Sequence, residues 1–254
     1  MTDLVVLLGH PIGYSASPAM HNAAFAALGM DTRYELADVG PPHLRAAVDA
    51  LRLKGRIGAN VTQPHKLAVC DLVDEVSPDV ERLGAANTIV RDGDRLVAHN
   101  TDLPALAAEV GGIRPLRRAV VLGNGGASRA AQWALAEAGC EVTVVDRQRW
   151  PQLPSLLANA DLLVNATPIG TGSDETPVEA DSLRPDLSVL DLVYRPTPSR
   201  LVREARAIGA PAQGGAGMLL TQAVLSFELW TGRHAPVEVM TEALRAELGG
   251  DWDA

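Results

Sequence analysis

Two serine hydroxyls stand two residues apart near the N-terminus, where an apolar run gives way to a helical pattern. Ser15 and Ser17 follow the buried-strand run Leu4–Leu8, and Pro18 comes directly after the second serine. Serine followed by proline is typical of a helix start, where the unpaired backbone N–H groups of the first turn favour anions. Two hydroxyls at such a start can hold a small anion, although Ser17 by itself could equally serve only as the helix cap.

A second group of residues with binding chemistry is the glycine-rich segment after the apolar run Ala119–Leu122. It precedes the helical pattern Ala130–Ala138, and such a strand, turn and helix let the backbone approach a pyrophosphate at a helix N-terminus. The next strand, Val142–Val145, ends in Asp146, where a carboxylate can accept from the ribose hydroxyls of NAD. The sequence therefore predicts a dinucleotide site. The loop residues expected in it are Gly123, Asn124, Gly125, Gly126 and Ala127.

The residues after Asp146 leave the choice between NAD and NADP open. The Asp146 carboxylate would repel a 2′-phosphate, whereas Arg147 and Arg149 could pair with one. The stretch from Asp146 to Asp161 is too short for a full helix, a turn and another strand, so we expect only one short helix, near Leu153–Ala158. Because that loss removes scaffold that would hold the arginines, we expect NAD to be accepted at least as well as NADP.

Four motifs give the chain a family resemblance. Gly9–Asn22, which contains the two serines, is followed in order by Gly58–Lys66, Gly84–Thr88 and His99–Asp102. Their order and spacing resemble those of the shikimate dehydrogenase family, and the resemblance runs nearly end to end. Several motifs in a fixed order are far more specific than any one glycine-rich loop.

The resemblance implies a reversible, NAD(P)-linked reduction of 3-dehydroshikimate to shikimate, a step of aromatic amino-acid biosynthesis. Reducing a ketone requires a group that stabilises the developing alkoxide and delivers a proton. The family uses a lysine and a carboxylate, which are Lys66 and Asp102 in this sequence. Taken without the resemblance, Lys66 could be an exposed helix lysine and Asp102 the N-cap of the following helix.

The same resemblance implies a substrate site built mainly from neutral hydrogen-bonding groups. Ser15 and Ser17 would bind the substrate carboxylate, and amides, hydroxyls and the catalytic pair would surround the ring hydroxyls. Such a site rejects analogues that lack the hydroxyls, because its own buried polar groups would be left unpaired. Asn87 and Gln222 could instead only satisfy backbone groups. The residues expected around the ring are Asn60, Thr62, Lys66, Asn87, Asp102 and Gln222, with Tyr194 from a later segment.

Three later segments match the family on the cofactor side. They are Asn165–Pro168, Asp191–Pro196 and Gly214–Leu219, and the last two correspond to the nicotinamide side. The resemblance implies that these segments line a cleft between two domains. The residues expected to contact the cofactor, besides the glycine-rich loop and Asp146, Arg147 and Arg149, are Thr167, Leu192, Gly215 and Met218.

Departures from the family pattern leave alternatives. NADP-specific members usually carry Asn-Arg-Thr where this chain has Asp146, Arg147 and Gln148, which favours an NAD-dependent quinate or shikimate dehydrogenase. Serine rather than threonine at Ser17 favours shikimate over quinate. The shortened nucleotide half also suggests a non-catalytic regulator that binds a dinucleotide or shikimate, although an intact Lys66 argues against it.

Composition excludes several classes of protein. The chain has 254 residues, 47% of them apolar, and a formal net charge of −9, so it lacks the basic surface that nucleic acid or an anionic membrane requires. The N-terminal apolar run is too short for a signal peptide, and no segment approaches a membrane span, so we expect a cytoplasmic protein. Cys70 and Cys140 and the six scattered histidines lack metal-ligand spacing, so no metal is expected. The sequence does not predict an oligomeric state.

The elements that position these residues alternate between strand and helix, so we expect an α/β protein with two α/β domains around a cleft. The second domain is expected to be Rossmann-like with a shortened nucleotide half. Residues 1–102 would form the substrate domain, completed by C-terminal helices in 218–254, and residues 103–217 the dinucleotide domain. A hairpin is expected around Asp92-Gly93 and a linker near Gly111, Gly112 and Pro115. The expected early elements are strands Leu4–Leu8, Thr32–Leu36 and Ile57–Val61, with helices from Pro18, Pro41 and Pro64.

Overall fold

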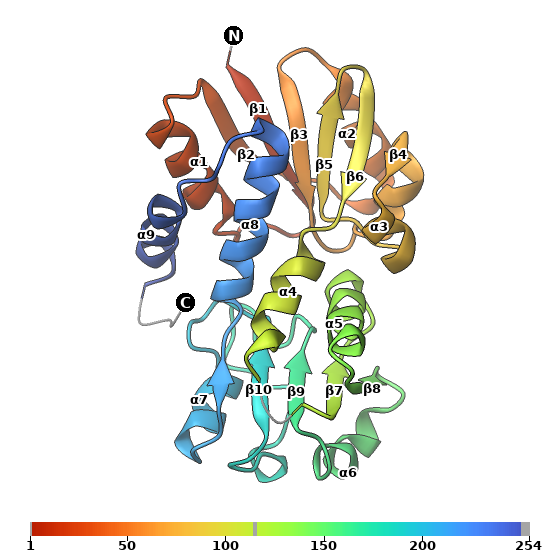
Figure 1. Cartoon of the computed structure of the whole chain (residues 1–254), viewed down its shortest axis with the longest axis vertical. Coiled ribbons are helices and arrows are strands. Elements are labelled where there is room, and N and C mark those ends of the chain that lie inside the picture. Colours follow the sequence, from red (N-terminus) through yellow and green to blue (C-terminus); the bar gives the residue numbers. More distant parts are fainter. Residues whose placement is uncertain (1, 114–115, 250–254) are drawn as a thin grey trace. The chain divides into compact units, whose positions relative to one another are not determined.

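A computed structural model describes residues 2–113 and 116–249 (Figure 1). The chain divides into two compact units, and each is described by itself. The first unit comprises Met1–Asp102 and Leu220–Glu247, and the second comprises Leu103–Leu219 and Leu248–Ala254. Pro115, expected in a linker, and residues 250–254, expected at the end of the substrate domain, lie outside the described residues.

The first unit contains a mixed sheet in which the described strands run in the order β2-β1-β3-β5-β6-β4. Strand β1 pairs in parallel with β2 and β3, while β5 runs antiparallel to both β3 and β6, which confirms the expected hairpin. The strands are β1 (Asp3–Gly9), β2 (Thr32–Asp38), β3 (Arg56–Val61), β4 (Glu75–Val76), β5 (Thr88–Asp92) and β6 (Arg95–His99). The helices are α1 (Ser17–Ala27), α2 (Leu44–Asp49), α3 (Pro78–Leu83), α8 (Ala216–Thr231) and α9 (Val237–Leu248).

The apolar face of the central strands packs on helix α2. Ala59 on β3 stands opposite Ile89 on β5, and both belong to a buried cluster that includes Val48 of α2. Side chains alternate between the two faces of a strand, so the neighbouring pair Asn60 and Thr88 points to the opposite face. That polar pair faces helix α8, which lies across the sheet in Figure 1.

An aromatic cluster fills the α8 side of this sheet. The rings of His21 and Tyr34 stack with their centroids 4.5 Å apart, and Trp230 lies 5.2 Å from His21. Burial lowers the pKa of His21 to about 3, so the ring stays neutral and packs as an apolar group. Trp230 Nε1 donates to Ile89 O at 2.9 Å. A Cβ at Gly58 would lie 2.6 Å from the Trp230 ring, so a glycine is needed for α8 to approach the sheet.

Two local expectations about this unit are wrong. Ser17 is the first residue of α1 rather than its cap, because Ala16 takes the N-cap position and no side chain caps the helix. The expected α-helix from Pro64 is replaced by a turn and a short 3₁₀ helix, Ala68–Leu72. Lys66 lies in that turn, and its carbonyl accepts from the backbone N–H of Ala86 at 2.8 Å. This tertiary hydrogen bond uses a carbonyl that a helix would otherwise pair internally.

The second unit contains a parallel sheet in the order β11-β10-β9-β7-β8, with helices on both faces. Helices α6 and α7 pack on one face through a single buried cluster. This order is the Rossmann order without a third strand beyond β8, so the predicted shortened nucleotide half is confirmed. The strands are β7 (Arg118–Leu122), β8 (Glu141–Val145), β9 (Leu162–Asn165), β10 (Ser188–Asp191) and β11 (Ala212–Gln213). The helices are α4 (Asp102–Gly111), α5 (Gly126–Glu137), α6 (Leu153–Leu157) and α7 (Arg200–Ala207).

The open edge of β8 is covered by the segment that replaces the missing strand. Arg149 Nη1 donates to Val144 O at 2.8 Å, on the side of β8 that faces away from β7. Trp150 packs partly buried against the core, and Leu153 and Leu157 of α6 are buried in it. Covering an edge strand in this way removes a template for pairing with other chains.

Across the described ranges, no helix is long and apolar enough to cross a membrane. Within the same ranges, no three His, Cys, Asp or Glu side chains come together as metal ligands would. Cys70 and Cys140 are both free thiols.

Candidate active site

The predicted substrate residues of the first unit come from one edge of its sheet, the edge that the ends of the strands form. Strands β1, β3 and β6 end at this edge, and β5 begins there because it runs antiparallel to its neighbours. The segments after β1 and β3 touch directly, since a Cβ at Gly9 would lie 2.3 Å from Cγ2 of Thr62. The topology therefore brings together residues from four motifs that are far apart in the sequence.

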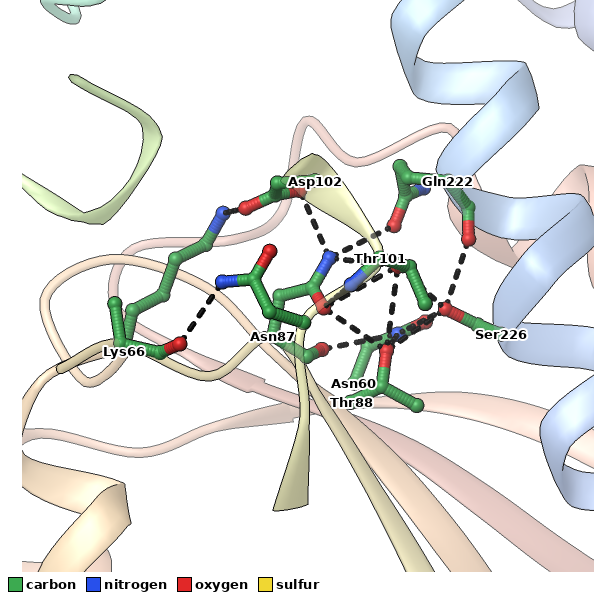
Figure 2. Close-up of polar contacts among 10 residues, drawn as sticks. Asn60, Lys66, Asn87, Thr88, Thr101, Asp102, Gln222 and Ser226 are labelled. Atoms are coloured by element: carbon green, nitrogen blue, oxygen red, sulfur yellow. Dashed lines mark hydrogen bonds and ion pairs between the residues drawn. The ribbon is translucent and has the colours of Figure 1, made fainter. Parts of the chain in front are cut away.

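Lys66 and Asp102 form a buried ion pair. Lys66 Nζ lies 2.5 Å from Asp102 Oδ2, and the two side chains are 16% and 4% exposed (Figure 2). The second carboxylate oxygen, Oδ1, accepts from Asn87 Nδ2 at 2.8 Å. Both carboxylate oxygens are therefore engaged, which fixes the direction in which Asp102 holds the ammonium group.

The orientation of the Asn87 amide follows from its neighbours. The backbone N–H of Thr101 donates to Asn87 Oδ1 at 2.8 Å, and a backbone N–H can only donate. Asn87 Nδ2 must then face the other way, toward Asp102 Oδ1 and the Oε1 of Gln222, which lies 3.5 Å away. Asn87 is 2% exposed and links the pair of Lys66 and Asp102 to helix α8.

Three hydroxyls at the same edge keep hydrogen-bonding capacity. Ser15 Oγ accepts from the Ser17 backbone N–H at 3.3 Å. The hydroxyls of Ser17 and Thr62 make no hydrogen bond among the described residues, although Ser17 is only 6% exposed. Hydroxyls that are accessible and keep hydrogen-bonding capacity suit a bound polar ligand.

Asn60, expected as a substrate ligand, has its amide engaged within the protein. Its Nδ2 lies 3.1 Å from Asn87 O, Thr88 Oγ1 and Ser226 Oγ, and its Oδ1 accepts from the Tyr34 hydroxyl at 2.8 Å. The side chain is 4% exposed. This arrangement supports neighbouring residues, and direct contact between Asn60 and a substrate stays a prediction.

Sequence reasoning did not assign a role to three buried hydroxyls behind Asn87. Thr88 and Thr101 belong to the motifs that contain Asn87 and Asp102. The sequence therefore indicated that they lie near the site, but it did not indicate what they do there. Ser226 follows Gln222 by one helical turn, and that spacing was the available signal.

In the second unit, the expected cofactor residues lie at the carboxyl ends of the parallel strands. Gly123 follows β7 with φ of +103°, and a Cβ there would lie 3.0 Å from Ala166 O, so the turn requires glycine. Gly125 is the N-cap of α5, and no side chain caps that helix. The first-turn N–H groups, including those of Gly126 and Ala127, therefore have no helical partner, which suits a pyrophosphate.

The Asp146 side chain closes the turn after β8. Its Oδ1 accepts from the backbone N–H groups of Gln148 and Arg149 at 3.0 and 3.2 Å. The Arg149 guanidinium donates to Val144 O, whereas Arg147 is exposed and makes no hydrogen bond among the described residues. Of the two arginines expected near a ribose phosphate, Arg147 alone is thus without another contact in the described chain.

A buried carboxylate organises the next two strand ends. Asp191 Oδ1 accepts from Asn165 Nδ2 at 2.9 Å and from the Val193 N–H at 3.1 Å, and its Oδ2 accepts from the Ser199 hydroxyl at 2.6 Å. Burial raises the pKa of Asp191 to about 6. Asn165 Oδ1 in turn accepts from Thr167 Oγ1 at 2.7 Å, which fixes the turn beside Gly123.

The remaining expected residues lie after β10 and at the start of α8. A Cβ at Gly215 would lie 2.3 Å from Leu192 O, so this contact also requires glycine. Met218 is 7% exposed. Tyr194 is partly buried and follows β10 in the second unit, whereas the other expected substrate residues belong to the first unit.

Comparison with known proteins adds to this geometry. Residues 7–89 match the shikimate dehydrogenase substrate binding domain, and residues 215–245 match the shikimate 5′-dehydrogenase C-terminal domain. The chain is 43% identical to a shikimate dehydrogenase (NADP(+)) of Halorubrum lacusprofundi, over 97% of this chain and 99% of the relative.

Two solved structures are also similar. One is shikimate 5-dehydrogenase of Thermus thermophilus in complex with NADP(H) and shikimate, with a TM-score of 0.86, 38% identity, and coverage of 97% of this chain and 100% of that chain. The other is quinate dehydrogenase of Corynebacterium glutamicum in complex with NAD, with a TM-score of 0.84, 32% identity, and coverage of 96% and 99%.

Proposed function

The chain belongs to the shikimate dehydrogenase family, and on that premise we propose that it catalyses the reversible reduction of 3-dehydroshikimate to shikimate with NADP or NAD. The observation that carries the proposal is the buried pair of Lys66 and Asp102, held by Asn87 at the edge where the substrate-domain motifs meet. In this proposal, proton transfer takes place in the first unit, which contains both residues.

The catalytic pair supplies the proton. When bound, the nicotinamide cofactor provides the hydride. Lys66 donates a proton to the carbonyl oxygen as it becomes an alkoxide, and Asp102 orients the ammonium and stabilises its charge. In the reverse direction the neutral Lys66 amine accepts the proton of the substrate hydroxyl.

The lysine content of the chain supports this role. Only Lys54 and Lys66 are lysines, and the other 20 of the 22 basic side chains are arginines. Lys54 is exposed, whereas Lys66 lies in the buried pair. An arginine does not give up its proton in proteins, so a lysine is needed where a cation must act as an acid.

The substrate carboxylate is assigned to Ser15 and Ser17. The Ser17 hydroxyl makes no hydrogen bond among the described residues, and it stands at the first position of α1, where backbone N–H groups favour an anion. Thr62 and Gln222 flank Lys66 and Asn87 at the same edge and are assigned to the ring hydroxyls.

The cofactor is assigned to the carboxyl edge of the parallel sheet. Its pyrophosphate would lie on the first turn of α5, next to the turn that Gly123 requires. The remaining assigned contacts are Asn124, Gly125, Gly126, Ala127, Asp146, Arg147, Arg149, Thr167, Leu192, Gly215 and Met218, with Tyr194 on the substrate side.

Quinate oxidation with NAD is the second candidate. It is favoured by Asp146, whose carboxylate suits a ribose diol, and by the similarity to the quinate dehydrogenase of Corynebacterium glutamicum. Serine rather than threonine at position 17 is the sequence feature that favours shikimate.

A steady-state assay of the purified chain separates these candidates. Shikimate and quinate are each oxidised with NAD and with NADP, and formation of the reduced cofactor is followed by absorbance. We expect turnover with shikimate and a higher kcat/KM for shikimate than for quinate. A higher kcat/KM for quinate would replace the first candidate by the second, and no turnover with either substrate would leave a non-catalytic regulator.

A further inference from the structure

The Ser226 hydroxyl lies at the centre of a buried polar cluster behind the proposed substrate site. It donates to Gln222 O at 2.9 Å, one turn earlier in α8. Its oxygen lies 2.8 Å from Thr88 Oγ1, 3.1 Å from Thr101 Oγ1 and 3.1 Å from Asn60 Nδ2 (Figure 2). One side chain of α8 thus contacts β3, β5 and the segment that precedes α4.

The directions of these hydrogen bonds follow from donor chemistry. A serine hydroxyl has one hydrogen, and Gln222 O can only accept, so that hydrogen is used within α8. Ser226 Oγ is then an acceptor for Asn60 Nδ2 and for a threonine hydroxyl. When Thr101 donates to Ser226, its own oxygen is left to accept from Asn87 Nδ2 at 2.9 Å.

We propose that Ser226 is a positioning residue for the substrate site, and this inference rests on the proposed function. Ser226 and Thr88 are both 0% exposed, so neither can touch a ligand. Ser226 acts instead on Asn87 through Thr101, whose Oγ1 lies 3.1 Å from Ser226 Oγ and accepts from Asn87 Nδ2, and it also binds the backbone carbonyl of Gln222. Removing it takes one acceptor from the buried network that holds the Asn87 amide, and such networks depend on every member being satisfied.

The test compares two serine or threonine substitutions on the same helix. Ser226→Ala removes the cluster acceptor, whereas Thr231→Ala removes a similar hydrogen bond to the preceding turn, from Thr231 Oγ1 to Phe227 O at 2.8 Å, away from the cluster. We expect Ser226→Ala to lower kcat/KM for shikimate by about tenfold, by lowering kcat and raising the shikimate KM, with the cofactor KM unchanged. Thr231→Ala should leave all three values unchanged.

A double-mutant cycle shows whether Ser226 works through Asn87. In an Asn87→Ala background, Ser226→Ala should change kcat/KM by less than about twofold, because the side chain it positions is gone. A full tenfold loss in both backgrounds would overturn the proposal. So would a Ser226→Ala protein that has lost thermal stability but keeps the wild-type kcat and shikimate KM.

A spectroscopic measurement keeps the inference separate from the proposed function. The side-chain NH₂ signals of Asn87, assigned from their loss in Asn87→Ala, should shift in Ser226→Ala and stay in place in Thr231→Ala. Unmoved signals would contradict the positioning role even in an active enzyme. A wild-type chain that does not oxidise shikimate would contradict the proposed function while these signals still decide the role of Ser226. If Ser226→Ala does not fold, Thr88→Val removes the neighbouring hydroxyl at nearly constant volume, and the same outcomes apply.

Discussion

The two units hold polar groups at a sheet edge by different means. In the first unit, side chains bind one another: Lys66, Asp102 and Asn87 form a connected set that reaches helix α8. In the second unit, the turns at the edge require glycines at Gly123 and Gly215, and the side chains bonded there, such as those of Asp191 and Asn165, hold the turns. The difference indicates that side-chain substitutions in the first unit alter chemistry, whereas most in the second unit alter only local geometry.

The buried carboxylates of the two units sharpen this contrast. Asp102 has a lysine as counterion, with Nζ 2.5 Å from Oδ2. Asp191 is held by the neutral donors of Asn165, Val193 and Ser199, and burial raises its pKa to about 6. Asp102 thus has a cation beside it, whereas burial without a counterion favours the protonated form of Asp191.

The largest effect is expected from Asp102→Asn. The substitution removes the negative charge that orients the Lys66 ammonium, and it keeps the size of the side chain. We expect kcat for shikimate to fall by about 10²- to 10⁴-fold, the usual contribution of a positioned acid or base. Steady-state kinetics with Asp71→Asn, an exposed aspartate in the same unit, provides the matched control. A loss of less than tenfold would mean that the pair is structural.

The next effect concerns the pH dependence of folding stability. The pKa of Asp191 is about 6 in the folded chain against an ordinary value of 3.8, so the folded state binds the proton more tightly than the unfolded state does. The contribution of Asp191 to the free energy of unfolding is therefore present at low pH and is lost as pH rises from about 4 to 6. The loss corresponds to about 3 kcal/mol, at 1.36 kcal/mol for each pKa unit.

Asp191→Asn tests this sign directly. Denaturant unfolding of wild type and variant at pH 4, 5, 6 and 7 gives the difference in free energy of unfolding at each pH. We expect the variant to gain about 2.4 kcal/mol relative to wild type between pH 4 and 7, because the amide does not titrate. A difference that is constant with pH would contradict the raised pKa.

A smaller effect is expected from the carboxylate ligands. Ser17→Ala should remove a hydrogen bond to the substrate carboxylate, at a cost of about 1.5–3 kcal/mol for a charged partner, and so raise the shikimate KM by roughly tenfold or more. The cofactor KM should stay unchanged. Ser77→Ala, which removes the cap of α3, controls for damage to a helix start. Equal increases in both KM values would indicate a folding defect instead of a lost ligand.

The smallest effect concerns cofactor choice. Asp146→Asn keeps the Oδ1 atom that accepts from Gln148 and Arg149, so the turn is preserved while the charge is removed. We expect the NADP-to-NAD ratio of kcat/KM to rise about tenfold, which corresponds to ~1.4 kcal/mol of relieved repulsion. Arg147→Ala should shift the ratio the other way. A wild-type preference of a hundredfold for NADP would show that Arg147 outweighs Asp146.

Sequence patterns predicted the fold well where local signals and packing agree. Buried runs such as Leu4–Leu8 became strands, and the short stretch after Asp146 predicted both the missing strand and the short helix now seen at Leu153–Leu157. The helix expected from Pro64 failed because tertiary contacts decide that segment. His65 is buried with Nε2 bonded to Val39 O at 2.5 Å, and the Lys66 carbonyl bonds to Ala86.

The candidate site was predictable only in part. Motifs named Lys66 and Asp102, and the structure places them in contact. The supporting hydroxyl of Ser226 could not be found in this way, because its partners Thr88 and Thr101 lie more than a hundred residues away in the sequence. Such pairs are set by the register of the sheet and the placement of α8, which no local pattern encodes.

The measurement that tests the central claim most directly is the turnover of Lys66→Ala, compared with its affinity for shikimate. We expect kcat to fall by about 10²- to 10⁴-fold while the dissociation constant of shikimate, measured by calorimetry, changes far less. Lys54→Ala, at the only other lysine of the chain, should behave as wild type. Wild-type turnover in Lys66→Ala would contradict the assignment of Lys66 as the proton donor.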